Sequence, residues 1–473
     1  MLSAHRVEQV RAAEAALMAT LPPGTLMQRA AAGLAVACAR RLDGVYGRRV
    51  ALLVGRGDNG ADALWAGMRL ARRGAAVTAV LTGDPRPDAL AALRAAGGRV
   101  GDADAVDRAD LVVDGLVGIG GRGALREPAA ALADRSAGRD VVAVDVPSGV
   151  DADTGAVEGA AVRAALTVTF GTLKPGLLVG AGRQHTGRLR LVDIGLGPHL
   201  ARAEVQQLED DDVAALLPVA EPGSDKYTRG VVGVAAGSQQ YTGAAVLAVG
   251  AAVRAGAGMV RFAGAPHAAE QVRTRWPEAV VTVAEGADVV DVGRVQAWVV
   301  GPGLGTDERA AATVEAVLDQ DVPVLVDADG LTVVAQHQDW LRRRTAPMLL
   351  TPHDREFARF GAEVGVDRVA SARRLAADLG VTVLLKGDAT VVTDGAVVRV
   401  NATGTPALAT AGTGDVLSGG CGALLAGGLG ALDAGSAAAH LHGLAGRLAA
   451  GGAPTSASAV LEAWPDAVRA VRG

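Results

Sequence analysis

The sequence has few of the residues that mark several large classes of protein. Its 473 residues include two cysteines, Cys38 and Cys421, which cannot build a disulfide framework or a structural zinc site, so we expect a reducing cytoplasm. The formal net charge of −5 lacks the basic surplus of a nucleic-acid carrier. The least charged stretch, residues 416–432, is mostly Gly and Ala, and we interpret it as a buried helix, not a membrane span. The charged segment 1–18 lacks the apolar core of a signal peptide.

Lysine and asparagine are also scarce. Only three of the 46 basic residues are lysine (Lys174, Lys226 and Lys386), and asparagine occurs only as Asn59 and Asn401. Since the ordinary surface cation of this chain is Arg, each Lys or Asn is a candidate for a specific chemical role. Compositional drift is the alternative.

Strand-like and helical stretches alternate along the chain. Continuous Val/Leu runs are followed by glycine turns and Ala-rich segments, which is the pattern of a parallel sheet covered by helices on both faces. The expected strands are 48–55, 75–83, 109–118, 139–149, 230–236, 296–300, 322–327, 346–350 and 381–385. A polar, acidic stretch lies at 208–225. We therefore predict an α/β protein of two domains, 1–208 and 209–473, each with a mainly parallel sheet.

Two local signals add detail to the second half. Thr306 is expected to cap a helix that runs to about Gln320, because Asp307 and Glu308 follow it in the first turn. Residues 390–400 are expected to form a hairpin that turns at Asp394-Gly395.

Polar residues of the first half follow successive strands. Gly55, Gly57 and Gly60 form GxGxxG between a strand and a helix, a geometry that binds a diphosphate, although a tight turn alone can explain it. The same loop carries Asp58, Asn59 and Asp62, and two later strands lead to Asp114 and to Asp145 with Ser148. Carboxyl ends of parallel strands converge on one crevice, where such oxygens can hold a hard cation. Lys174 either meets a phosphate or pairs with a carboxylate.

The second half carries the strongest motif, TAGTGDVLSGG at 410–420. Gly412 and Gly414 free backbone amides for an anion, and Asp415 is placed to take a proton from an attacking hydroxyl. Lys386 leads into the hairpin, where it suits nucleotide phosphates. His353 and Glu356 lie just beyond a strand, so His353 can contact substrate and Glu356 can organise Mg²⁺ through water.

The motifs GRGDNGADAL, DGLVGIGGRG, VVAVDVPSGVDADTG and TVTFGTLKPGLLVGAG, in this order, resemble the NAD(P)H-hydrate epimerase domain. That resemblance covers most of residues 1–205 and implies a Rossmann-like fold, a K⁺ ion held by Asn59, Asp114 and Ser148, and Asp145 as a catalytic residue at the nicotinamide ring. It also implies that two segments bind the substrate diphosphate and ribose. These are Asp58, Asn59, Gly60, Ala61 and Asp62, and then Gly118, Ile119, Gly120, Gly121, Arg122, Gly123 and Ala124.

Nearly all of 209–473 resembles the ADP-dependent NAD(P)H-hydrate dehydratases of the ribokinase-like superfamily, on the segments KYTRGVVGVAAGS, VGPGLG, LTPH and TPALATAGTGDVLSGG. The resemblance implies Asp415 as the catalytic residue, with Ala244, Gly303 and His353 also at the hydrated nicotinamide nucleotide. It implies a nucleotide site made of Lys386, Gly387, Asp388, Ala389, Thr390, Gly412 and Gly414.

The two resemblances together imply one bifunctional repair enzyme. It would interconvert the epimers of hydrated NADH or NADPH and dehydrate one of them with ADP, using K⁺ and Mg²⁺. We expect small-molecule substrates, no nucleic acid, no membrane and a homo-oligomer. The alternative is a kinase of another small alcohol, with a first half that only binds nucleotide or serves assembly.

Overall fold

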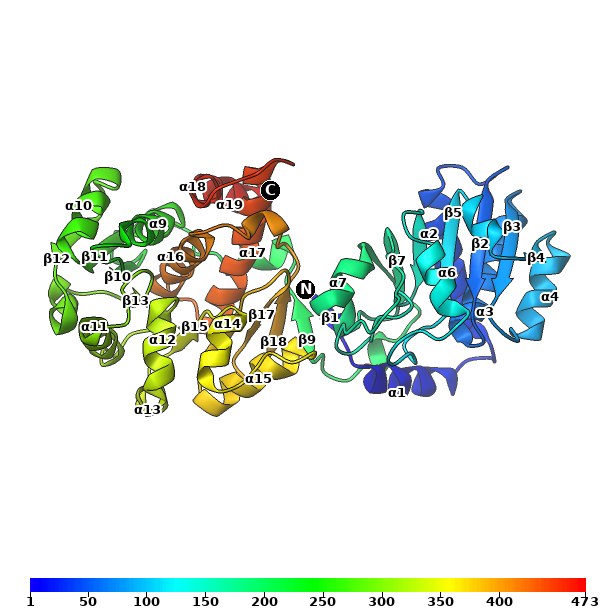
Figure 1. Cartoon of the computed structure of the whole chain (residues 1–473), viewed down its shortest axis with the longest axis horizontal. Coiled ribbons are helices and arrows are strands. Elements are labelled where there is room, and N and C mark those ends of the chain that lie inside the picture. Colours follow the sequence, from blue (N-terminus) through cyan, green and yellow to red (C-terminus); the bar gives the residue numbers. More distant parts are fainter. The chain divides into compact units, whose positions relative to one another are not determined.

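The computed structural model describes residues 1–473, which form two compact units (Figure 1). One unit is Ser3–Val205, and the other is Met1–Leu2 with Gln206–Gly473. The boundary predicted from the sequence, 208/209, lies three residues later. Two three-residue strands, β1 (Leu2–Ala4) and β9 (Val205–Gln207), lie where the chain passes from one unit to the other.

The first unit is built on a parallel sheet in the order β4-β3-β2-β5-β6-β7-β8. Its strands are β2 (Arg49–Val54), β3 (Ala76–Leu81), β4 (Arg99–Gly101), β5 (Leu111–Gly115), β6 (Val141–Val144), β7 (Leu166–Phe170) and β8 (Arg188–Val192). Its helices are α1 (Val7–Met18), α2 (Thr25–Arg41), α3 (Asp58–Ala71), α4 (Pro87–Ala95), α5 (Asp104–Asp107), α6 (Ala129–Arg135) and α7 (Gly180–Thr186).

Alternate residues of one strand pack on opposite faces of this sheet. Along β2, Val50, Leu52 and Val54 join a core with α2 and α3, while Ala51 and Leu53 join another core with α6. This division follows from the two-residue period of a strand and explains why the run is apolar without interruption.

The second unit has a parallel sheet in the order β12-β11-β10-β13-β14-β15-β16, extended by the antiparallel strands β17 and β18. Its strands are β10 (Val231–Ala235), β11 (Met259–Gly264), β12 (Val280–Val283), β13 (Ala297–Val300), β14 (Val324–Val326), β15 (Met348–Leu350), β16 (Thr382–Leu385), β17 (Thr390–Thr393) and β18 (Val398–Asn401). Its helices are α8 (Asp210–Leu216), α9 (Thr242–Arg254), α10 (Pro266–Arg275), α11 (Glu308–Leu318), α12 (Asp329–Gln336), α13 (Gln338–Arg343), α14 (Asp354–Phe357), α15 (Arg368–Leu379), α16 (Thr413–Ala426), α17 (Ala431–Ala450), α18 (Ala457–Glu462) and α19 (Trp464–Arg472). The prediction of two mainly parallel α/β sheets is confirmed.

Two local predictions need correction, and the predicted hairpin is confirmed. Asp307, not Thr306, caps α11, because its carboxylate accepts a hydrogen bond from the amide of Ala310, and the helix ends at Leu318. The β17–β18 hairpin turns over residues 394–397, which include the predicted Asp394-Gly395, and the Asp394 carboxylate accepts from two amides within the turn. The Gly/Ala-rich stretch at 416–432 is not one helix, because α16 ends at Ala426.

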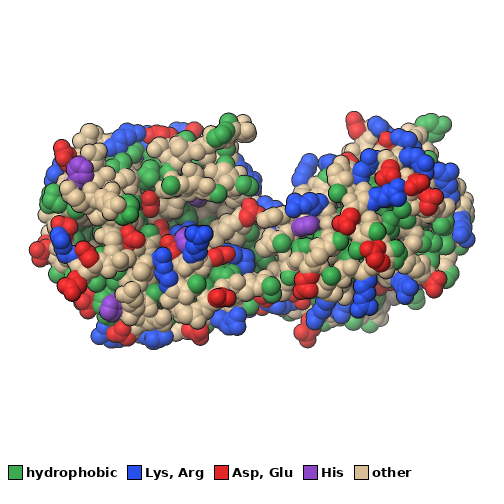
Figure 2. Space-filling model, viewed as in Figure 1, with side chains coloured by type: hydrophobic (Ala, Val, Ile, Leu, Met, Phe, Trp, Pro, Cys, Tyr) green, Lys and Arg blue, Asp and Glu red, His purple; other side chains and the backbone are tan.

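The surface is consistent with a chain of mixed charge. Basic and acidic side chains are interspersed on the face that Figure 2 shows, with no extended patch of one sign. None of the helices combines the length and apolar character needed to span a membrane.

Candidate active sites

The first site lies where the strand order of the first unit reverses, between β2 and β5. Ligands of open α/β sheets bind at such a switch point, beyond the carboxyl ends of the strands. The GxGxxG motif joins β2 to α3 there, and its glycines have different roles. A Cβ on Gly55 would lie 1.8 Å from the Leu116 carbonyl, and one on Gly60 would lie 2.2 Å from the Gly55 carbonyl, so both serve backbone packing. Only Gly57 borders open space.

Residues 58–62 form the first turn of α3, not the loop that the sequence suggested. The side chain of Asp58 is 82% exposed, and its carboxylate lies 3.7 Å from the Arg86 guanidinium. Ala61 and Asp62 are buried, and one carboxylate oxygen of Asp62 has no hydrogen-bond partner. Burial raises the pKa of Asp62 well above its ordinary value, and the charge of Asp145 adds to this effect. A buried carboxyl that resists ionisation therefore lies at this site.

The three residues predicted to hold a cation converge at the ends of β5 and β6. Ser148 donates to Asp114 Oδ1 at 2.6 Å, and its amide donates to Asp114 Oδ2 at 2.8 Å. Asn59 Nδ2 donates to the Val144 carbonyl at 2.6 Å, which fixes the amide side chain at the end of β6. Burial raises the pKa of the fully buried Asp114 to about 6.

The glycine loop 118–124 begins at Asn59 and leads outward. A Cβ on Gly118 would lie 2.2 Å from Asn59 Oδ1, so the loop starts in direct contact with the amide side chain. The Gly121 amide donates a hydrogen bond to the Gly118 carbonyl at 2.9 Å, which closes a turn. Gly118, Ile119 and Gly121 are half-buried, whereas Gly120 and the stretch 122–124 are exposed.

Asp145 follows β6 directly, so it lies at the same edge of the sheet. Its partner is Lys174, at 2.5 Å, so the lysine pairs with a carboxylate and the phosphate alternative is not needed to explain it.

The second site lies at the switch point of the second unit, between β10 and β13. The two loops that leave these strands meet there, since the Gly237 amide donates to the Pro302 carbonyl at 2.7 Å. Gly303 has a φ of +65°, and a Cβ on it would lie 2.9 Å from the Cβ of Ala244 in the first turn of α9. The structure thus brings together two of the residues predicted to contact substrate.

Asp415 lies in the first turn of α16, which begins after Gly412 at a φ of +87°. Burial raises the pKa of Asp415 to about 7, and the nearby charge of Asp327 adds to the effect. A carboxyl with a pKa near neutrality is well suited to accept a proton in a reaction at physiological pH.

Lys386 and Gly414 meet around a residue that the sequence analysis missed, Asp327. Lys386 Nζ donates to Asp327 Oδ1 at 2.8 Å, and Ser418 Oγ donates to Asp327 Oδ2 at 2.7 Å. A Cβ on Gly414 would lie 3.7 Å from Lys386 Nζ and 3.8 Å from Asp327 Oδ2. Burial alone would raise the pKa of Asp327, but the Lys386 ammonium and the hydrogen bonds hold it below its ordinary value. Asp327 directly follows β14, and this position at the carboxyl end of a strand is the sequence feature that could have identified it as a site residue.

The neighbouring Ala328 is held in an unusual conformation, with a φ of +50° and a ψ of −118°. Such backbone strain persists only where the surroundings impose it and is concentrated at functional sites. The Gly305 amide, which donates to Asp329 Oδ2 at 2.9 Å, fixes one side of this turn.

His353 is the N-cap of α14. Its Nδ1 accepts from the amides of Arg355 and Glu356, and Glu356 Oε2 accepts from the His353 amide at 2.8 Å. The same Glu356 oxygen lies 3.5 Å from Lys386 Nζ, so α14 is tied to the Lys386–Asp327 pair. The ring of His353 remains half exposed, with 48% of its side chain open to solvent.

The rest of the predicted nucleotide segment connects β16 to β17. Gly387 and Asp388 are exposed, while Ala389 and Thr390 are buried at the start of β17. The Lys386 carbonyl accepts from the Arg368 guanidinium at 2.9 Å, which anchors the segment to α15.

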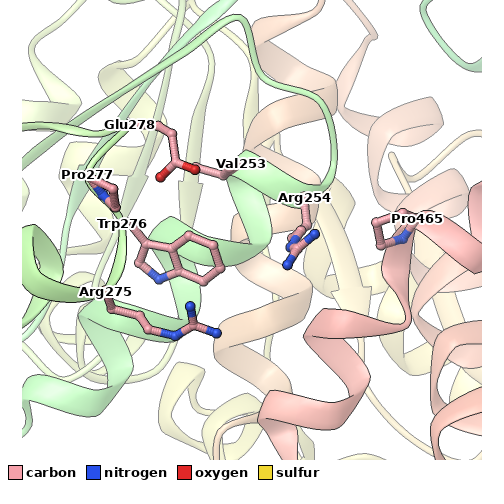
Figure 3. Close-up of a pocket in the computed structure, with 7 residues that line it drawn as sticks. All are labelled: Val253, Arg254, Arg275, Trp276, Pro277, Glu278 and Pro465. Carbon is pink, nitrogen blue, oxygen red and sulfur yellow. The ribbon is translucent and has the colours of Figure 1, made fainter.

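A hollow of about 550 Å³ in the second unit contains none of these residues. Figure 3 shows the Trp276 indole in this hollow, with the guanidinium groups of Arg254 and Arg275 near its ring. Both arginines are ion-paired with Glu462, at 2.5 and 2.9 Å. Because Glu462 already pairs with both guanidinium groups, we interpret the cluster as a brace between α9, α10 and α18.

Two family models match the chain, one within each unit. Residues 232–462 match the family model described as NAD(P)H-hydrate dehydratase, and residues 23–176 match the model described as YjeF-related protein N-terminus. The bifunctional NAD(P)H-hydrate repair enzyme of Mycobacterium tuberculosis is 54% identical over 418 residues, which cover 86% of this chain and 85% of that protein. The enzyme of the same name from Moorella thermoacetica is 34% identical, covering 91% and 89%.

A solved structure resembles the second unit. The ADP/ATP-dependent NAD(P)H-hydrate dehydratase of Bacillus subtilis, co-crystallised with ATP and Mg²⁺, is 29% identical with a TM-score of 0.52, and the match covers 56% of this chain and 99% of that chain.

Proposed function

The chain belongs to the family of bifunctional NAD(P)H-hydrate repair enzymes, and on that premise we propose a role for each of its units. The protein acts on hydrated NADH and NADPH, in which water has added across the dihydronicotinamide ring and left a ring hydroxyl. The first unit interconverts the R and S epimers of this hydrate. The second unit dehydrates the S epimer with ADP, yielding NAD(P)H, AMP and phosphate.

The observation that carries the dehydratase role is Asp415, which lies half-buried in the first turn of α16 directly after Gly414 and has a pKa of about 7. Hydroxide is a poor leaving group, so the ring hydroxyl must first be converted to a better one. Asp415 takes the hydroxyl proton as the β-phosphoryl group of ADP moves to the oxygen. Amides at Gly412 and Gly414 stabilise the phosphoryl charge. Phosphate then leaves, driven by the lone pair of the ring nitrogen, and loss of a proton from the neighbouring ring carbon restores the double bond of NAD(P)H.

The proposed nucleotide site consists of residues 386–390 together with Gly412 and Gly414. Asp327 supports it by holding the Lys386 ammonium beside Gly414. No group of three or more His, Cys, Asp or Glu side chains is arranged to hold a metal ion. This fits Mg²⁺, which keeps several waters and is bound by one or two carboxylates and by substrate phosphates, with Glu356 as the proposed carboxylate. Bound Mg²⁺ would neutralise phosphate charge during transfer.

In the first unit, Asn59, Asp114 and Ser148 are the proposed ligands of K⁺. Their donor atoms are the amide, carboxylate and hydroxyl oxygens that hard cations prefer. The fully buried carboxylate of Asp114 has hydrogen-bond donors but no cationic partner, so a bound monovalent cation would balance its charge. The first turn of α3 and the loop 118–124 are the proposed site for the diphosphate and ribose, and Asp145 is proposed to act at the ring hydroxyl.

The two roles can be tested together by following the recovery of reduced-nicotinamide absorbance from a mixture of NADH-hydrate epimers with ADP and Mg²⁺. Wild-type protein should recover all of it. Asp145→Ala should stall once the S epimer is consumed, because only epimer exchange is lost, and Asp415→Asn should bind ADP but not turn over. Wild-type protein that stalls in the same way would refute the epimerase role. No recovery, with a stable phosphoester formed from ATP and another alcohol, would indicate a kinase.

We also propose that the protein works in a reducing cytoplasm. Both cysteines, Cys38 and Cys421, are fully buried free thiols, which is typical of a chain that does not depend on disulfides.

A further inference from the structure

Lys174 is the most deeply buried lysine of the chain, with 1% of its side chain exposed. Its ammonium donates to Asp145 Oδ1 at 2.5 Å, to Thr169 Oγ1 at 3.0 Å and to the Phe170 carbonyl at 3.1 Å. An ammonium has three N–H groups, and all three are used by the protein. Lys174 therefore has no donor left for a substrate.

The carboxylate of Asp145 is bound in a strongly asymmetric way. Oδ1 accepts from Lys174, from Thr169 Oγ1 at 2.9 Å and from the Phe170 amide at 3.1 Å, whereas Oδ2 accepts from no protein group. The backbone of Asp145 has a φ of +65°, although its amide remains paired with Val168 at the end of the sheet. A non-glycine residue keeps such a conformation only where its surroundings impose it. The structure thus directs one oxygen inward and leaves the other unpartnered.

The charges around this pair are mostly acidic. Glu14 on α1 and Asp58 and Asp62 on α3 all act electrostatically in this region, together with Asp145. Burial raises the pKa of Glu14 as well as that of Asp62, and the Lys174 ammonium opposes the shift at Glu14. Arg11 and Arg86 also face the cluster, but Lys174 is the cation in contact with Asp145. Neighbouring carboxyls in environments of opposite kind are the usual basis for separate acid and base roles.

We propose that Lys174 is the positioning residue of the epimerase site: it occupies Oδ1 of Asp145 and leaves Oδ2 as the oxygen that meets the substrate. The proposal rests on the epimerase role of the first unit. The ring hydroxyl passes its proton to Oδ2, and its oxygen forms a carbonyl as the adjacent carbon–nitrogen bond breaks. The electron pair of that bond stays on the ring nitrogen, delocalised toward the carboxamide. Reclosure on the other face of the carbonyl, with return of the proton, gives the other epimer.

The test is a double-mutant cycle in the full chain, with Lys174→Met, Asp145→Asn and the double variant. Epimer exchange is measured as the slow phase of NADH recovery, and the dehydratase phase of the same chain is an internal standard for enzyme concentration. Lys174→Met should lower kcat for exchange about 100-fold, the lower end for loss of general acid–base catalysis, with KM unchanged because Nζ does not reach substrate. The double variant should be no slower than Asp145→Asn, since Lys174 acts only through Asp145.

Thr169→Val is the matched control. It removes a neutral donor from the same oxygen, Asp145 Oδ1, but keeps the ion pair, so its loss in kcat should be several times smaller. Should Lys174→Met unfold the first unit, the double variant should refold it, because the unpaired buried carboxylate is then gone.

Three results would overturn the proposal: an unchanged kcat in Lys174→Met, a rise in KM at constant kcat, or additive losses in the double variant. Absence of exchange in wild-type protein would instead refute the epimerase role itself.

Discussion

Replacing Asp415 by asparagine should stabilise the second unit at neutral pH while it removes dehydratase turnover. The cause is the cost of keeping a partly buried carboxylate charged next to Asp327. In the folded protein the pKa of Asp415 is about 7, against an ordinary value of 3.8. The folded state therefore binds a proton that the unfolded state has already lost between these two values, and stability falls as pH rises from about 4 to about 7.

The size of the effect follows from the shift. A difference of about 3 pH units corresponds to a destabilisation of about 4 kcal/mol above pH 7, where both states are ionised. At pH 5 Asp415 is still largely protonated in the folded state, so only part of that cost is present. The free energy of unfolding of wild type should therefore be about 2–3 kcal/mol lower at pH 8 than at pH 5 through this group. Asparagine does not titrate. The increase in the free energy of unfolding that Asp415→Asn brings over wild type should therefore be larger at pH 8 than at pH 5 by that amount.

Urea unfolding followed by tryptophan fluorescence suits this test, because four of the five tryptophans lie in the second unit, and Trp298 and Trp464 are fully buried. Asp378→Asn, which changes an exposed carboxylate on α15, is the control and should shift stability equally at both pH values. Parallel pH dependence of wild type and Asp415→Asn would refute the argument that Asp415 is held near neutrality. In wild type, kcat/KM for dehydration should fall as pH drops below about 7, since the base must be ionised.

Further predictions concern the other contacts. Lys386→Met should destabilise the second unit by about 3–5 kcal/mol, because Asp327 is left buried without its cation, and should weaken ADP binding in calorimetry; adding Asp327→Asn should restore stability but not ADP affinity. Ser148→Ala should abolish the dependence of epimer exchange on K⁺, measured against choline, and leave dehydration intact; a retained K⁺ response would remove Ser148 from the ligand set. Gly303→Ala should raise the KM for the hydrate about tenfold, since its Cβ would lie 2.9 Å from that of Ala244 at a positive φ; an unchanged KM would show that this loop yields easily.

Helices and strands were predictable where the sequence carries one strong pattern, such as a continuous apolar run that ends in glycine. Long Val/Leu runs such as β2 and β10 are buried on both faces, so their apolar character is continuous and their ends are marked by glycine. Short or partly exposed strands gave no such signal. In β12 the first and last residues are exposed valines, and the strand was not predicted. The cap of α11 was assigned one residue too early because Thr306 and Asp307 are both good caps, and only geometry decides between them.

The candidate sites show a similar limit. Sequence motifs identified Asp145, Asp415 and Lys386, but not the partners that control their charge. Asp327 is remote in sequence from Lys386, and the two pair because β14 and β16, which flank β15, end at the same edge of the parallel sheet. The partner of Lys174 was likewise undetermined, because a lysine after a strand can bind either a phosphate or a carboxylate. Local spacing does not encode such contacts between distant segments.

The different exposure of the three lysines has a practical consequence for attaching the protein to surfaces and probes. Lys174 is fully enclosed, and the pKa of Lys386 is raised, despite its burial, by Asp327 and Glu356, which keeps its amine protonated and poorly nucleophilic. Lys226 is the only exposed lysine. Amine-directed reagents should therefore react, apart from the terminal amine, at a single side chain close to the start of the second unit. The protein carries a natural single-site handle, which would permit oriented immobilisation or placement of a fluorophore without engineering.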